Sequence, residues 1–161
     1  MSTLRLGLIS DTHGYLDPAV PGLFQDVDHI LHGGDVGSMR ILHELEQLAP
    51  ITAVLGNTDG PELGVREREV LKLGGLVWLV QHIVDPLSAD TAWTDSLTRT
   101  KADIVLFGHT HKPFDQQIGK VRYLNPGYAG RQRFDLPRSV AILEVSESEM
   151  NLRFLPLTGS A

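Results

Sequence analysis

Seven polar residues in five short clusters constrain this chain more than any other feature of its sequence. Each cluster directly follows an apolar run that has the length and composition of a strand. The seven are Asp11, His13, Asp35, Asn57, His82, His109 and His111. Because parallel strands present their carboxyl ends at one edge of a sheet, we expect these side chains to gather there.

The clusters recur at nearly regular intervals. Positions 13, 35, 57, 82 and 109 are separated by 22, 22, 25 and 27 residues. Each interval is about one strand-loop-helix unit, which returns the chain to the same sheet edge. Carboxylate, amide and imidazole groups are the nitrogen and oxygen donors that divalent transition metals bind. The pattern therefore predicts a site for two divalent metal ions.

Taken singly, each cluster has an ordinary structural explanation. Asp11 could cap a turn, residues 56–60 have the composition of a turn, and His82 could be a core histidine. His109 and His111 are more specific, since side chains at positions i and i+2 of extended chain point the same way and can face one cavity. Their joint order favours the metal site, because independent turns have no reason to recur at one sheet edge.

The apolar pattern predicts a single α/β domain over residues 1–161. With 42% hydrophobic residues the chain can bury one sizeable core. Hairpins alternate with buried strands, so we expect a two-layer β-sandwich of mixed sheets flanked by helices. The expected strands are 4–9, 28–31, 51–55, 70–73, 76–80, 104–107, 113–117, 120–124, 140–145 and 151–157, and the expected helices lie between Ser38 and Pro50 and over 86–99.

Composition excludes several classes of protein. No apolar stretch approaches the roughly 18 residues of a membrane span, and the first ten residues lack the pattern of an export signal. The chain has no cysteine, which excludes disulfides and thiolate zinc sites. We therefore expect a cytoplasmic protein with no membrane partner.

Charge points to a small anionic substrate. The net charge of −6 argues against binding to extended nucleic acid, which normally needs a basic face. Two divalent ions would carry four positive charges against the carboxylates of Asp11 and Asp35, which leaves a cationic pocket. A small phosphate ester is the expected ligand.

In their order the clusters resemble the motifs of the calcineurin-like metallophosphoesterases, and within them the small single-domain phosphodiesterases of bacteria and archaea. The resemblance covers nearly the whole chain. The family motifs Asp-x-His, Gly-Asp, Gly-Asn, His and Gly-His-x-His match Asp11-Thr12-His13, Gly34-Asp35, Gly56-Asn57, His82 and Gly108-His109-Thr110-His111. The family fold is a two-sheet sandwich with flanking helices, in agreement with the expected elements.

The resemblance implies how the metals are held. One ion would take Asp11, His13, Asp35 and His111, and the other Asp35, Asn57, His82 and His109, with Asp35 bridging. Asp35, Asn57 and His109 are the expected catalytic residues. Manganese is the expected metal, while iron, nickel, cobalt and zinc also suit the donor set. Hydroxide held between the ions would attack the phosphorus in line.

Three departures from the family pattern bear on the substrate. Thr58 stands where many larger members have a histidine thought to assist the leaving group, so we expect a preference for good leaving groups, with Asp59, His32 or water as the other proton donors. Ile83 stands where the small branch has glycine, which makes the pocket wall apolar. Tyr128 replaces a serine, and Arg133 falls where an arginine often follows. The expected substrate-binding residues are Asn57, Thr58, Tyr128 and Arg133, although Tyr128 could simply pack at the surface and Arg133 could be solvated.

Three alternative functions stay open. A phosphomonoesterase differs only in whether the pocket admits a second ester group. A non-catalytic protein-binding scaffold is a second alternative, because the small subunit of the retromer coat resembles the same branch. A nuclease is disfavoured by the acidic charge. The apolar run 76–80 or the last strand could support a homo-oligomer, and core packing explains both equally well.

Overall fold

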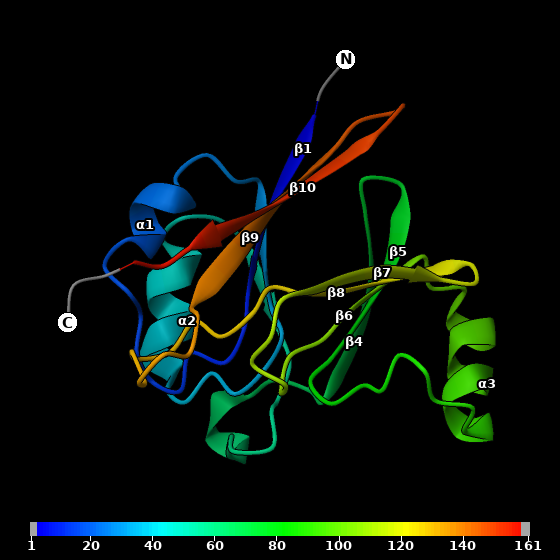
Figure 1. Ribbon diagram of the computed structural model, residues 1–161, viewed down its shortest axis with the longest axis horizontal. Coiled ribbons are helices and arrows are strands. Elements are labelled where there is room, and N and C mark those ends of the chain that lie inside the picture. Colours follow the sequence, from blue (N-terminus) through cyan, green and yellow to red (C-terminus); the bar gives the residue numbers. More distant parts are fainter. Residues whose placement is uncertain (1–2, 159–161) are drawn as a thin grey trace.

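Two five-stranded mixed sheets form the framework of the computed structural model, which describes residues 3–158 (Figure 1). The first sheet has the order β10-β9-β1-β2-β3, and its strands are β1 (Leu4–Ile9), β2 (His29–His32), β3 (Ile51–Ala53), β9 (Ser139–Val145) and β10 (Met150–Pro156). The second has the order β4-β5-β6-β8-β7, and its strands are β4 (Arg68–Leu73), β5 (Leu76–Gln81), β6 (Ile104–Leu106), β7 (Phe114–Ile118) and β8 (Val121–Asn125).

Each sheet contains three neighbouring strands that are parallel to one another. Strand β2 lies parallel to β1 and β3, and strand β6 lies parallel to β5 and β8. The outer pairs β9–β10, β4–β5 and β7–β8 are antiparallel hairpins. The parallel strands therefore end on the same side of their sheets, which is the side where the predicted ligand clusters follow.

The main core lies between the two sheets. Leucines from β1 and β9 meet Trp78 and Val80 of β5 and Ile104 and Leu106 of β6, all at most 1% exposed. Because successive side chains of a strand face opposite sides, the alternate residues form two further clusters on the outer faces. Each sheet thus has buried apolar residues on both of its faces.

Helices cover those outer faces. The first sheet is covered by α1 (Val20–Leu23) and α2 (Met39–Glu46), and the second by α3 (Thr91–Thr100) (Figure 1). A short 3-10 helix, η1 (Pro61–Leu63), follows β3. Ser38 caps α2 as expected, since its hydroxyl accepts a hydrogen bond from the Arg40 amide at 3.1 Å. Within residues 3–158 no helix has the length and apolarity needed to cross a membrane.

The sandwich predicted from the sequence is confirmed, and each expected strand is present with small shifts at its ends. The helix predicted over 86–99 is wrong at its start, because α3 begins only at Thr91. Asp85 and Ser88 accept hydrogen bonds from the amides of Leu87 and Asp90, and such local bonds compete with a helix. Helices α1 and η1 were not predicted, because each is a single turn without a repeating apolar stripe.

Candidate metal centre

All seven predicted residues lie in loops at one end of the sandwich. The loops follow β1, β2, β3, β5 and β6, the parallel strands of both sheets. Two of these loops run side by side, because the amides of His13 and Gly14 donate to the carbonyls of Asp35 and Val36 at 2.9 and 2.8 Å. The register of β1 against β2 therefore fixes how the first two clusters meet.

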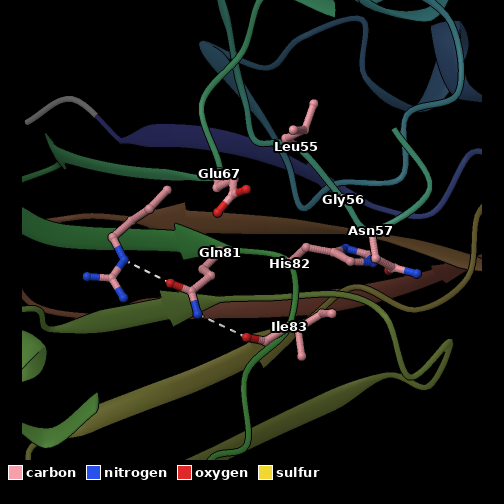
Figure 2. A pocket seen from close by; sticks show the side chains of 8 residues that line it. Leu55, Gly56, Asn57, Glu67, Gln81, His82 and Ile83 are labelled. Carbon is pink, nitrogen blue, oxygen red and sulfur yellow. Dashed lines mark hydrogen bonds between the residues drawn. The ribbon is translucent and has the colours of Figure 1, made fainter. Parts of the chain in front are cut away.

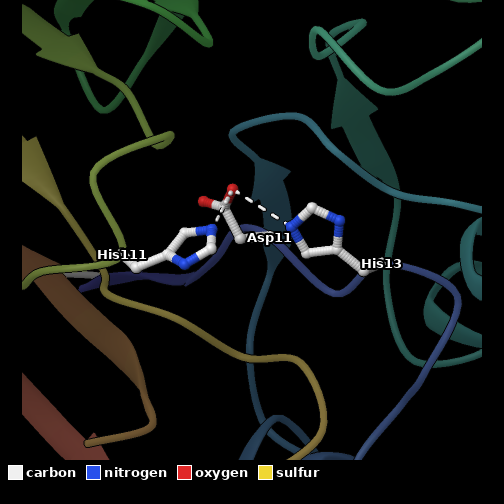
Figure 3. Close-up of side chains that lie close together, drawn as sticks. All are labelled: Asp11, His13 and His111. Atoms are coloured by element: carbon white, nitrogen blue, oxygen red, sulfur yellow. Dashed lines mark ion pairs between the residues drawn. The ribbon is translucent and has the colours of Figure 1, made fainter. Parts of the chain in front are cut away.

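A first group consists of Asp11, His13 and His111 (Figure 3). The Oδ1 atom of Asp11 lies 3.7 Å from Nε2 of His13 and 3.3 Å from Nε2 of His111. Asp11 is fully buried, whereas the two histidines are partly exposed. One carboxylate oxygen thus faces two imidazole nitrogens that come from opposite sides.

A second group consists of Asp11, Asp35 and His82, and all three are buried. Nε2 of His82 lies 3.2 Å from Oδ2 of Asp35 and 3.7 Å from Oδ1 of Asp11. Oδ2 of Asp35 is also 3.7 Å from Nε2 of His13. Both carboxylates therefore lie close to ligand atoms of both groups, whereas the family resemblance implied this for Asp35 alone.

Asn57 and His109 complete the set at its exposed rim. Oδ1 of Asn57 and Nδ1 of His109 are 3.1 Å apart, and the His109 ring meets that of His82 edge to face with centroids 5.3 Å apart. All seven predicted residues are thus brought together, five of them facing shared space and two at the opening.

Three buried polar atoms in this centre have no hydrogen-bond partner within residues 3–158. They are Oδ1 of Asp11, Nε2 of His13 and Nε2 of His82. Buried polar atoms are rarely left without a partner, because each loses its hydration and gains nothing in return. Donor atoms that bind one ion at about 2.1 Å each lie roughly 3 to 4 Å apart, which matches the separations above. The residues fit divalent cations.

The other oxygen of each carboxylate is anchored by the protein. Oδ2 of Asp11 accepts hydrogen bonds from the Ser10 hydroxyl at 2.7 Å and the His109 amide at 3.1 Å. Oδ1 of Asp35 accepts one from the Thr58 amide at 2.9 Å. These bonds fix the orientation of both side chains and leave one oxygen of each turned toward the histidines.

His82 is oriented in the same manner. Its Nδ1 atom lies 2.8 Å from the carbonyl oxygen of Gly33, an acceptor, so Nδ1 carries the proton. Nε2 is then the ring nitrogen that faces the carboxylates and is free to bind an ion. A histidine whose second nitrogen donates to a carbonyl has the tautomer required of a metal ligand.

The backbone at the centre adopts a conformation that side chains usually avoid. Five of the seven residues have left-handed φ values: 58° for Asp11, 47° for His13, 55° for Asp35, 72° for His109 and 62° for His111. The extended chain assumed for His109 and His111 is therefore wrong. Such strain costs of order 1 kcal/mol or more per residue and concentrates at functional sites.

The glycines before two of these clusters leave room for the carboxylates. A Cβ atom on Gly56 would lie 2.1 Å from Oδ1 of Asp35. One on Gly108 would lie 2.1 Å from Oγ of Ser10 and 2.6 Å from Oδ2 of Asp11. Neither position can hold a larger residue without displacing a carboxylate, so both glycines serve close approach.

Charge pairing sets the protonation of the first group. Burial raises the pKa of Asp11, but the nearby imidazole of His13, the electrostatic influence of His82 and His111 and the hydrogen bond from Ser10 outweigh it and lower the pKa below its ordinary value. The nearby carboxylate of Asp11 raises the pKa of His13. Burial lowers the pKa of His111. Asp11 is thus ionised at neutral pH and attracts cations.

His32 supports the centre from behind. It is fully buried, its Nδ1 atom accepts a hydrogen bond from the Gly34 amide at 3.1 Å, and its Nε2 atom lies 3.0 Å from Oγ1 of Thr12. That hydroxyl donates onward to the carbonyl of Val36 at 2.8 Å. Burial lowers the pKa of His32 to about 4, so the ring is neutral.

Asp59 is also a supporting residue. Its carboxylate accepts hydrogen bonds from the amides of Val36, Gly37 and Gly56 at 3.1, 2.9 and 2.9 Å, and so joins the second and third loops. From the sequence, His32 and Asp59 were considered only as possible proton donors. Their side chains are instead occupied by hydrogen bonds within the protein.

The remaining substrate-binding candidates differ in how exposed they are. Thr58 and Arg133 are exposed beside the centre. Tyr128 is only 1% exposed, and its ring packs against that of His111 with centroids 4.7 Å apart. The guanidinium of Arg133 lies 5.7 Å from the Tyr128 ring. Tyr128 therefore supports His111 in this structure and presents almost no surface to a substrate.

Comparison with known proteins places the chain in a family. A sequence model described as the calcineurin-like phosphoesterase superfamily domain matches residues 4–148. A probable metallophosphoesterase of Methanothermobacter thermautotrophicus is 35% identical, over 94% of this chain and 92% of its own length. A phosphodiesterase of Methanocaldococcus jannaschii is 26% identical, over 91% and 96%.

The fold has close structural counterparts. The zinc complex of Vps29 from Entamoeba histolytica superposes with a TM-score of 0.81 at 23% identity, over 98% of this chain and 95% of that one. At that identity the likeness concerns the fold. The family model spans all five ligand clusters and most of the chain, so this protein belongs to the calcineurin-like phosphoesterase superfamily.

Proposed function

We propose that this protein is a dinuclear metal-dependent phosphodiesterase. The observation that carries the proposal is the set of buried, partnerless atoms on Asp11, His13 and His82, which face one another within two overlapping groups of possible ligands. A structural polar cluster would satisfy those atoms internally. Atoms left open at ligand spacing are suited to bound cations, and the superfamily supplies the reaction class.

We assign the residues as follows. Asp11, His13 and His111 would hold one ion, and Asp35, His82, Asn57 and His109 the other, with both carboxylates placed to contact both ions. When bound, the two ions lower the pKa of a coordinated water and neutralise charge on the phosphoryl oxygens. Asn57 and His109, at the exposed rim, are positioned to meet the substrate. Arg133 adds a positive charge at the same opening.

None of the three residues considered as leaving-group acids is placed for that role. Thr58 does not titrate near neutral pH, and His32 and Asp59 are committed to internal hydrogen bonds. We therefore propose that the leaving group departs as an anion or takes its proton from water. Rates for a series of aryl diesters should rise steeply as the pKa of the leaving phenol falls. A flat dependence would show that some residue donates the proton.

The test of the main proposal begins with protein stripped of metal. Manganese should restore hydrolysis of an aryl phosphodiester, and the diester should react faster than the corresponding monoester. Asp35→Asn and His109→Ala should each lower kcat/KM at least about 100-fold, because each removes a proposed ligand. Asp26→Asn and His43→Ala are matched controls, since both residues are exposed and lie outside the centre.

Three outcomes separate the candidate functions. Faster monoester hydrolysis would favour a phosphomonoesterase. Manganese binding without turnover of either ester would favour the scaffold function, for which the Vps29-like fold is the supporting observation. Unchanged activity in Asp35→Asn would contradict the proposed centre itself.

A further inference from the structure

A cavity of about 450 Å³ adjoins the candidate metal centre (Figure 2). Asn57 and His82 belong to both. The remaining lining residues come from the segment after β3, the start of β4 and the end of β5: Leu55, Gly56, Glu67, Arg68, Gln81 and Ile83. Sites of roughly 300 Å³ and more accommodate drug-sized organic molecules, so this cavity exceeds the needs of a phosphate group.

The cavity contains a carboxylate and a guanidinium that do not pair. Within residues 3–158 Glu67 forms no ion pair, with Arg68 or with any other cation. Arg68 is held in place, because Nε donates to Oε1 of Gln81 at 2.8 Å and Nη1 to Oγ of Ser96 at 3.1 Å. Its Nη2 atom donates to no residue in the described range. The guanidinium also lies 5.9 Å from the ring of Trp93 in α3, so Arg68 is engaged on that side, whereas Glu67 lines the cavity without an ion-pair partner among the described residues.

Apolar surface borders these charged groups. Ile83 is 52% exposed, which is high for a large aliphatic side chain, and Leu55 is half-buried. Figure 2 shows the two on opposite sides of Glu67 and Gln81. Apolar walls with polar groups between them suit a flat ring that offers polar atoms along its edge.

We propose that this cavity binds the nucleoside group of a nucleotide ester, and that Glu67 selects guanine. The inference rests on the proposed phosphodiesterase function, since it places the ester phosphate at Asn57 and His82. Guanine presents two adjacent N–H donors on one edge, which complement the two carboxylate oxygens of Glu67. Adenine and uracil lack the two adjacent donors.

Three substrates with one leaving group test the selection. They are the p-nitrophenyl esters of guanosine 5′-monophosphate, adenosine 5′-monophosphate and methyl phosphate. The guanosine ester should have the highest kcat/KM, about tenfold above the adenosine ester, because a charge-assisted hydrogen bond contributes roughly that factor. Glu67→Gln should bring the guanosine and adenosine esters to within about twofold. Glu62→Gln, which removes an exposed charge in η1, should keep the tenfold ratio.

A binding measurement separates this inference from the proposed function. Guanosine 5′-monophosphate should shift the amide resonances of Gln81 and Ile83 in metal-free protein at lower concentration than adenosine 5′-monophosphate, and Ile83→Ala should weaken both. Guanine-selective shifts without turnover of any ester would support the guanine-binding pocket and contradict the phosphodiesterase function. Turnover of all three esters at equal kcat/KM, with no selective shifts, would overturn the pocket.

Discussion

Two buried charged clusters in this protein differ in whether their polar atoms have hydrogen-bond partners. Arg138 ion-pairs with Asp17 and donates to the carbonyls of Gly130 and Leu157 at 2.8 and 2.9 Å. The second oxygen of Asp17 accepts from the Ala19 amide at 2.8 Å. This cluster is closed, because all of the hydrogen-bonding groups named here have partners within the chain.

The metal centre is the open counterpart. Asp11, His13 and His82 each keep a buried atom without a partner, and Asp11 and His13 also have left-handed backbone. Closed clusters connect segments and stabilise the fold, whereas an open cluster stores unfavourable energy that a ligand can relieve. Burial of charge alone does not distinguish a structural cluster from a ligand-binding one. The two differ in whether their remaining polar atoms have hydrogen-bond partners within the chain.

The largest expected effect on the metal-free fold lies in the closed cluster. Arg138→Met leaves the Asp17 carboxylate buried without its cation, which should lower the free energy of unfolding by about 3 to 5 kcal/mol. Urea unfolding of metal-free protein measures this change, with exposed Arg153→Met as the control. A loss below about 1 kcal/mol would remove the distinction between the clusters.

Metal should stabilise only through the open cluster. Manganese at about 100 times its dissociation constant should raise the free energy of unfolding by about 2.7 kcal/mol for each ion bound, since the ions bind only the folded chain. Arg138→Met should retain this gain although its baseline is lower, and Asp35→Asn should lose most of it. Unfolding curves with and without manganese provide the measurement. An equal gain in Asp35→Asn would place the bound metal elsewhere.

Low pH should destabilise the fold through His32, which lies behind the open cluster. His32 has a folded-state pKa of about 4, below the ordinary value of 6.5, so between these values the unfolded chain binds more protons. The free energy of unfolding should therefore fall as the pH falls from 6.5 to 4, with His32 contributing about 1.4 kcal/mol per pH unit. His32→Gln should remove that contribution. Parallel pH profiles for the two metal-free proteins would contradict the assignment.

The smallest effect tests how little the open cluster adds to the metal-free fold. Asp35→Asn should change the free energy of unfolding of metal-free protein by less than about 1 kcal/mol. Oδ2 of Asp35 makes no hydrogen bond to the protein, and an amide oxygen can still accept the Thr58 amide. A loss as large as that of Arg138→Met would show that both clusters are structural.

The same contrast explains how much could be predicted from the sequence. The open cluster was predictable because its residues follow strands at regular intervals, and the parallel register of β1, β2 and β3 places those strand ends together. The closed cluster was not predicted. Asp17 and Arg138 are 121 residues apart, and neither stands in a repeating pattern.

Local conformation escaped prediction for a related reason. The left-handed backbone at Asp11 and His13 depends on hydrogen bonds between two loops, which a local pattern does not contain. The supporting roles of His32 and Asp59 depend on the same tertiary contacts. Periodicity predicted where the polar residues gather, while tertiary hydrogen bonds determine which of their atoms stay open.

Metal stoichiometry tests the central claim most directly. Protein stripped of metal, equilibrated with manganese and freed of excess should contain two ions per chain by elemental analysis. Asp35→Asn should retain fewer than two, and Arg138→Met, if folded, should still retain two. Wild-type protein that retains no manganese, or Asp35→Asn that retains the full complement, would contradict the account of an open cluster built to hold two cations.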